Sequence, residues 1–112
     1  MTTLPESIAA EPGERTTWMR RYTLNPALAE EFVQFLTQKV IPARESRGFT
    51  VESIWLDRDS SQLTWFVSRP GSSEEFAAAE REWEESDQRA EIFAGAPQYV
   101  TGKDLREVTR LR

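Results

Sequence analysis

The sequence predicts an α+β domain of the ferredoxin-like type, in which two helices cover one face of a four-stranded antiparallel sheet. Three observations predict it. Four segments have the composition of strands, two segments between them carry apolar residues at helical spacing, and most of the boundaries contain glycine or proline. The order is therefore β-α-β-β-α-β, and right-handed crossovers then give the strand order 4-1-3-2. A chain of 112 residues is long enough for one such domain.

Residues 1–14 contain proline, glycine and small residues without a clear period, so we expect a flexible leader before a single domain over residues 15–112. Residues 16–23 are rich in β-branched and aromatic types, which predicts the first strand. Because side chains alternate along a strand, Arg20 and Tyr22 share one face.

The first helix is expected to begin at Asn25-Pro26, because Asn caps free N–H groups and proline fits the first helical position. Pro42 falls late in the pattern, and its ring predicts a bend or a stop near Val40. Gly48 is expected to end the helix in the left-handed conformation. One apolar stripe recurs at helical spacing: Leu28, Phe32, Phe35, Leu36 and Val40.

Residues 49–57 and 63–69 are predicted to form a hairpin around a polar loop. Large residues occupy both faces of these strands, so neither face of the sheet is expected to be left in water. The helices cover one face, and a second copy of the same sheet is expected to cover the other in a homodimer. The alternation places Val51, Trp55, Trp65 and Val67 together, opposite Ile54, Leu56 and Phe66.

The second helix follows a turn, where Ser72 and Glu75 have the spacing of a capping box. Ser86-Asp87 is expected to break this helix and cap a short extension. The last strand is placed at residues 105–111. The inner side of the helix is marked by Phe76, Ala79, Glu80 and Trp83.

Composition excludes several classes of function. Cysteine and histidine are both absent, which excludes disulfides, thiolate or imidazole metal sites and Ser-His-Asp catalysis, and we expect no metal and no cofactor. A net charge of -5 makes nucleic acid and anionic membranes poor partners. No apolar run is long enough to span a membrane, and no secretory signal is recognisable, so a cytoplasmic location is expected.

The run from Arg20 to Pro26, Arg-Arg-Tyr-Thr-Leu-Asn-Pro, resembles the Arg-x-Tyr-Thr-Leu-x-Pro opening of the NIPSNAP family. Further positions follow in the order that this family shows: Phe32, Val40-Ile41-Pro42, Gly48-Phe49, Trp55 and Trp65. The chain departs from the family pattern at Ala27, where the family has glycine, and at Val67, where an aromatic residue is common.

The resemblance implies the dimeric α+β barrel superfamily, in which two ferredoxin-like subunits pack their sheets face to face. That superfamily includes small cofactor-free oxygenases, haem-degrading enzymes and members without a known activity. Its haem-degrading members rely on a ligating histidine, which this chain lacks. That branch is therefore excluded.

Four residues are candidates for binding a small apolar or aromatic ligand in a pocket between sheet and helices: Arg20, Tyr22, Trp55 and Trp65. Alternatively, Arg20 pairs with a neighbouring strand, for example through Glu107, while Tyr22 packs as core. The two tryptophans either line the pocket or fill the interior.

Two further charged pairs have an ordinary structural interpretation. Arg44 and Glu45, after the proline, are expected to form an exposed ion pair near one end of the fold. Asp57 and Asp59 flank the hairpin loop, and acidic turn residues commonly bond their own backbone.

Three functions remain open. The first, which we favour, is a small homodimeric protein that binds such a ligand. The second is a cofactor-independent monooxygenase or isomerase acting on an aromatic or polyketide-like substrate, with Arg20 stabilising developing negative charge. The third is a structural or regulatory protein that contacts a partner through its acidic second helix. An open cavity reached by Arg20 or Tyr22 favours the second, whereas Arg20 paired with a protein carboxylate and no cavity argues against it.

Overall fold

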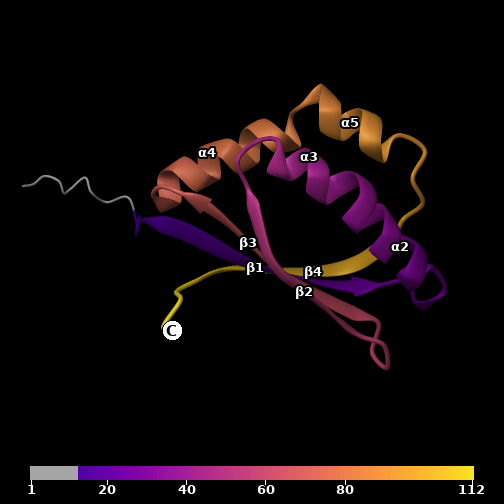
Figure 1. Ribbon diagram of the computed structural model, residues 1–112. Helices are drawn as coiled ribbons and strands as arrows, with labels where there is room; N and C mark the ends of the chain where they lie inside the picture. The colour runs from indigo at the N-terminus through magenta and orange to yellow at the C-terminus, as the bar shows by residue number, and fades with distance from the viewer. Residues whose placement is uncertain (1–12) are drawn as a thin grey trace, which may run out of the picture.

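The computed structural model describes residues 13–112, so the predicted leader lies outside the described residues apart from Gly13 and Glu14. Four antiparallel strands form one sheet in the order β2-β3-β1-β4, which confirms the predicted strand order. The helices that the structure describes all lie on one side of the sheet (Figure 1). The strands are β1 (Arg15–Leu24), β2 (Thr50–Asp57), β3 (Gln62–Pro70) and β4 (Val100–Val108).

The first helical segment begins with a 3-10 turn over Pro26–Leu28, where the Asn25 side chain accepts a hydrogen bond from the Ala27 N–H at 3.1 Å. It continues as α2 (Ala29–Phe35), widens into a π-helical turn over Leu36–Val40 and ends as α3 (Ile41–Glu45). The disturbance predicted near Val40 is thus a π turn, and the helix continues past Pro42.

The helix-ending glycine and the second helical segment follow the sequence signals. Gly48 has a φ of 91°, the left-handed conformation that the sequence predicts. The capping box is formed, with Ser72 Oγ accepting from the Glu75 N–H at 3.2 Å and Glu75 Oε1 accepting from the Ser72 N–H at 2.8 Å. This box begins α4 (Ser73–Glu84), and Ser86 then caps α5 (Asp87–Phe93).

The register of the hairpin corrects the predicted faces of β2 and β3. Trp65 lies opposite Ile54, whereas Trp55 lies opposite Thr64. Opposed residues of antiparallel strands project from the same face, so the two tryptophans project from opposite faces. The prediction that they share a face is wrong because the loop length, which sets the register, is not visible in the alternation of either strand.

A bulge at Glu52 adds one residue to β2, so that Val51 pairs with Val67 and Ser53 pairs with Phe66. The extra residue returns Val51 to the side of the helices. The Glu52 carboxylate then accepts a hydrogen bond from the Ser68 hydroxyl at 2.6 Å.

The last strand begins earlier than predicted. It spans Val100–Val108 instead of residues 105–111, and Leu111 is 94% exposed. Pairing with β1 decides these bounds, since Leu24 lies opposite Val100 and Thr17 lies opposite Val108. The start of β4 is polar and contains glycine, so its composition does not show this pairing.

The core lies between the sheet and the helices, and its tightest part comes from β1, β3, both helical segments and the residue just before β2. Within residues 13–112, no helix is both long and apolar enough to cross a membrane. The most buried core side chains are Leu24, Phe32, Leu36, Phe49, Leu63, Trp65, Val67, Phe76 and Trp83.

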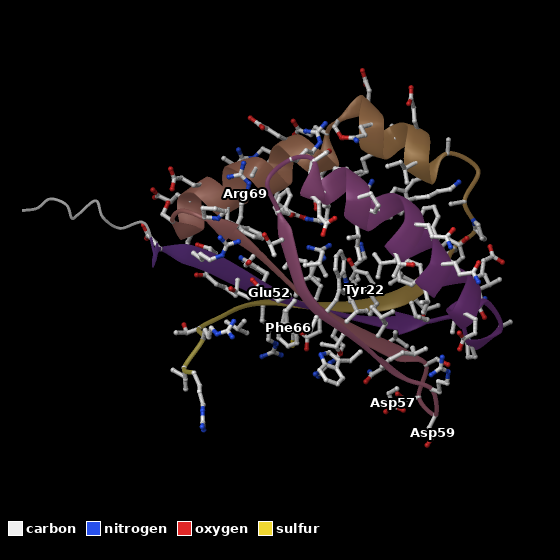
Figure 2. All side chains as sticks on the ribbon, viewed as in Figure 1. Tyr22, Glu52, Asp57, Asp59, Phe66 and Arg69 are labelled. Atoms are coloured by element: carbon white, nitrogen blue, oxygen red, sulfur yellow. The ribbon has the colours of Figure 1, made fainter. Side chains whose placement is uncertain are left out.

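The opposite face of the sheet, which we call the open face, has a mixed character. Register places Met19 against Phe66, and Trp55 on the same face is 65% exposed. Arg21 and Asp104 lie opposite each other on this face as well, so the open face is partly charged and not apolar throughout. Figure 2 shows Phe66 on this side and Tyr22 on the side of the helices.

Candidate functional site

A cavity of about 70 Å³ lies between the helices and the covered face of the sheet. Three strands and all of the helical segments from α2 onwards contribute to its lining. Its volume exceeds what one water molecule needs several times over. The apolar lining is Phe32, Leu36, Val40, Trp83, Phe93 and Val100, and the polar or amphipathic lining is Arg20, Tyr22, Arg44, Trp65, Glu84, Arg89 and Lys103.

Three of the four predicted ligand-binding residues meet at this cavity. Arg20 and Tyr22 are two apart on β1 and project from the same face, and the Arg20 Nε–H donates a hydrogen bond to the Tyr22 hydroxyl oxygen at 2.9 Å. Trp65 lies directly opposite Arg20 on β3. Its ring centre is 5.6 Å from the Arg20 guanidinium carbon and 6.1 Å from the Tyr22 ring centre. Strand pairing therefore assembles this group.

Trp55, the fourth predicted residue, does not join the group. It projects from the open face, as its pairing with Thr64 requires, and it does not line the cavity. The sequence suggests it as an aromatic wall of the pocket, and the register of β2 on β3 places it on the other face. The structure thus separates Trp55 from the cavity while it brings Trp65, which is 1% exposed, into the wall.

Glu80 of α4 joins two arginines beside the cavity. Its two carboxylate oxygens accept hydrogen bonds from the two terminal nitrogens of Arg44, each at 2.8 Å, which is the bidentate geometry of a strong arginine–carboxylate pair. Arg20 Nη1 donates to the same carboxylate at 3.2 Å. One acid therefore holds two buried cations.

Arg44 is the main site residue that sequence reasoning placed wrongly. An exposed pair with Glu45 was expected, but Arg44 is 2% exposed and pairs with Glu80, 36 residues away. The π turn continues the helix past the proline and carries Arg44 over the sheet. The sequence did contain a signal for this pair. Glu80 lies among the apolar residues on the inner side of its helix, and a buried carboxylate needs a cationic partner.

The neighbouring strand is not the partner of Arg20. Glu107 accepts a hydrogen bond from the Ser73 hydroxyl at 2.7 Å instead. Glu107 lies opposite Trp18 on β1, whereas Leu105 lies opposite Arg20, so the register does not place the carboxylate beside the guanidinium.

The ion pairs shift the ionisation of the buried groups. Burial by itself lowers the pKa of Arg20, but the Tyr22 oxygen and the Glu80 carboxylate outweigh it, so the pKa of Arg20 lies above its ordinary value. Burial also tends to raise the pKa of Glu80, but the hydrogen bonds and charges of Arg44 and Arg20 lower it by more. Its pKa therefore lies below the ordinary range, and the group is charged at neutral pH.

Of the two hairpin aspartates, Asp57 bonds the backbone of its own loop. Asp57 Oδ1 accepts from the Asp59 N–H at 3.0 Å and from the Ser60 N–H at 3.3 Å, as acidic turn residues commonly do. Figure 2 shows both residues at the tip of the β2–β3 hairpin, far from Tyr22.

The comparisons with known proteins support the fold. No family model and no curated protein matches the chain. Among solved structures, an uncharacterised NIPSNAP domain protein from Burkholderia xenovorans is similar with a TM-score of 0.72 at 10% identity, covering 85% of this chain and 93% of that chain. A NIPSNAP family protein from Agrobacterium tumefaciens has a TM-score of 0.75 at 10% identity, with coverages of 86% and 92%.

A third similar structure is a putative antibiotic biosynthesis monooxygenase from Bacteroides thetaiotaomicron, with a TM-score of 0.67 at 14% identity, covering 90% of this chain and 93% of that chain. At such identities the likeness establishes the fold and does not establish an activity. The ferredoxin-like architecture and the resemblance to NIPSNAP proteins, both predicted from the sequence, are confirmed at the level of the fold.

Proposed function

We propose that this chain is a NIPSNAP-like homodimeric protein that binds a small apolar or aromatic ligand between its sheet and its helices. The observation that carries the proposal is the cavity itself, which combines an aromatic and aliphatic wall with a few polar groups such as Arg20 and Tyr22. This combination is typical of small-molecule sites, where apolar walls supply affinity and a few polar groups set orientation.

Ligand binding is tested by thermal unfolding in the presence of flat acids and quinones. We expect at least one compound to raise the midpoint in a concentration-dependent way, because a ligand that binds only the folded state stabilises it. Val100→Trp, which fills the cavity from the start of β4, should abolish the rise, and Trp55→Phe on the open face should keep it. A panel that never moves the midpoint contradicts the proposal.

The proposed dimer forms by packing the open faces of two sheets against each other. Support comes from the half-buried Phe66 and the exposed Trp55, which present apolar area on a face that the helices leave free. The charged residues around this group would make the rim of such an interface.

Sedimentation tests the dimer directly. The parent chain should sediment at twice its 12.9 kDa mass, and Trp55→Asp should shift it toward the monomer. Gln38→Asp, an exposed change in the first helical segment, is the matched control and should leave the dimer intact. A folded parent chain that stays at 12.9 kDa at micromolar concentration contradicts the dimer.

The alternative is a cofactor-independent monooxygenase or isomerase acting on an aromatic or polyketide-like substrate. One observation favours it, because Arg20 lines an open cavity although it also pairs with Glu80. The arginine could then stabilise negative charge that develops on a substrate oxygen. Oxygen uptake and product analysis with hydroxylated aromatic compounds, without added cofactor, test it. Turnover that is lost in Arg20→Gln supports the alternative, and no turnover by the parent chain contradicts it.

The cytoplasmic location remains part of the proposal. Detection of the protein in a membrane or secreted fraction of its native cell would contradict it. The single domain over residues 15–112 is likewise proposed, and limited proteolysis that leaves this segment whole would support it.

A further inference from the structure

Two buried donors beside the cavity have no partner. Among the described residues, Nε of Arg44 and Nε1 of Trp65 are the buried side-chain nitrogens or oxygens that lack a hydrogen bond. The two residues are 2% and 1% exposed, and both line the cavity. Buried N–H groups are nearly always paired, because leaving one without an acceptor costs free energy. The cavity therefore presents two donors that can gain from an acceptor.

Tyr22 supplies a third donor. Its hydroxyl oxygen already accepts from Arg20 at 2.9 Å, and within residues 13–112 no acceptor is found for its own proton. A phenol that receives a hydrogen bond at its oxygen remains free to donate. All three groups that lack a partner are hydrogen-bond donors, so a ligand group that satisfies them must be a hydrogen-bond acceptor.

The charges around the cavity also favour an anion. Its lining contains four cations, Arg20, Arg44, Arg89 and Lys103, against one carboxylate, the exposed Glu84. Glu80, beside the cavity, pairs with Arg20 and Arg44 but carries one negative charge, so together with Glu84 it leaves two of the four cations in excess. An excess of positive charge in a chain whose net charge is -5 is local to this site.

We propose that the cavity binds a small carboxylic acid as its anion, with the carboxylate accepting hydrogen bonds from Trp65 Nε1 and Arg44 Nε and an apolar body packed on Phe32 and Leu36. The Arg44 guanidinium carbon is 5.6 Å from the Trp65 ring centre, so the two donors belong to neighbouring groups of the cavity wall. The inference rests on the proposed ligand-binding function and names the class of its ligand.

The test uses the full chain and follows the indole N–H signals of its four tryptophans by ¹H–¹⁵N NMR during titration with benzoate, phenylacetate and hexanoate. Trp65→Phe assigns the Trp65 signal, and Trp55→Phe assigns the Trp55 signal on the open face. We expect the acids to move the Trp65 signal and leave the Trp55 signal in place. The corresponding amides, benzamide, phenylacetamide and hexanamide, should bind at least tenfold more weakly.

Two variants test the contribution of the cavity's positive charge to anion binding, and both leave the buried ion pairs of Glu80 in place. Arg89→Gln and Lys103→Gln each remove a partly or fully exposed cation of the lining, and each should weaken benzoate binding up to about fivefold, the range of a screened charge interaction. Arg21→Gln on the open face is the matched control and should leave benzoate binding unchanged.

The outcomes separate the inference from the proposed function. If amides bind in the cavity as tightly as acids, the proposed function stands and the preference for an anion is wrong. If neither acids nor amides move any signal of a cavity residue, the inference is contradicted, and a rise in the unfolding midpoint with quinones would still support the proposed function. If acids move only signals outside the cavity, the inference is overturned.

Discussion

The two faces of the sheet each carry a tryptophan, and the two tryptophans differ in burial. Trp65 on the covered face is 1% exposed and contributes to a cavity wall, whereas Trp55, on the neighbouring strand, is 65% exposed on the open face. The two faces also differ in their ion pairs, which are buried beneath the helices and exposed on the other side. The contribution of a residue in this sheet therefore depends on the face that strand register assigns to it.

The largest expected difference between the faces comes from truncating each tryptophan. Trp65→Ala should lower the free energy of unfolding by about 3–5 kcal/mol, because it leaves a cavity in a packed core. Trp55→Ala should change it by less than about 0.5 kcal/mol in the monomer. Chemical denaturation at a concentration where sedimentation shows monomer measures both. Equal losses would mean that the open face is as well packed as the core.

The next effect compares one ion pair from each face. Glu80→Gln removes the charge that holds Arg20 and Arg44 and should cost about 3 kcal/mol, since two buried cations lose their counter-ion. Asp104→Asn breaks the exposed pair with Arg106 and should cost less than about 1 kcal/mol. The same denaturation experiment measures both. If Glu80→Gln lowers the free energy of unfolding only slightly, the ion pairs of Glu80 with Arg20 and Arg44 contribute little to stability.

A smaller effect is expected from acid alone. The pKa of Glu80 lies below its ordinary value in the folded state, so its ion pairs contribute stability that is fully present above the unfolded pKa. That stability is lost as the pH falls through the folded pKa, because the protonated acid no longer neutralises Arg44 and Arg20. Unfolding free energies measured from pH 7 down to pH 3 should decline less steeply in Glu80→Gln than in the parent chain. Parallel curves would contradict this assignment.

The smallest difference concerns single hydrogen bonds. Tyr22→Phe removes the oxygen that accepts from the buried Arg20 Nε–H and should cost about 1 kcal/mol. Thr64→Val removes the oxygen that accepts from Arg21 at 3.1 Å on the open face, where water can replace it, and should cost less than about 0.5 kcal/mol. A larger loss from Thr64→Val than from Tyr22→Phe would reverse the proposed contrast between the faces.

The elements of the fold were predictable because their signals are local. Asn25-Pro26, the Ser72–Glu75 box and Gly48 each act within a few residues, and the structure confirms all three. The start of β4 was not predictable in this way, because its polar residues become a strand only by pairing with β1.

The candidate site was predictable in part. Arg20 and Tyr22 share a face by simple alternation, which any register preserves. The sequence does not predict the ion pair between Arg44 and Glu80, because the π turn and the packing of α4 decide where the two side chains meet.

The sequence by itself determined the number and order of the strands and helices, their caps and the absence of thiol and imidazole chemistry, because these follow from periodicity, local hydrogen bonds and composition. Only the tertiary structure decided which tryptophan faces the cavity and which acid holds Arg20. Trp55 changes face with a one-residue change of register, and Glu80 is 60 residues from Arg20. Such relations depend on contacts between distant segments, which no local pattern records.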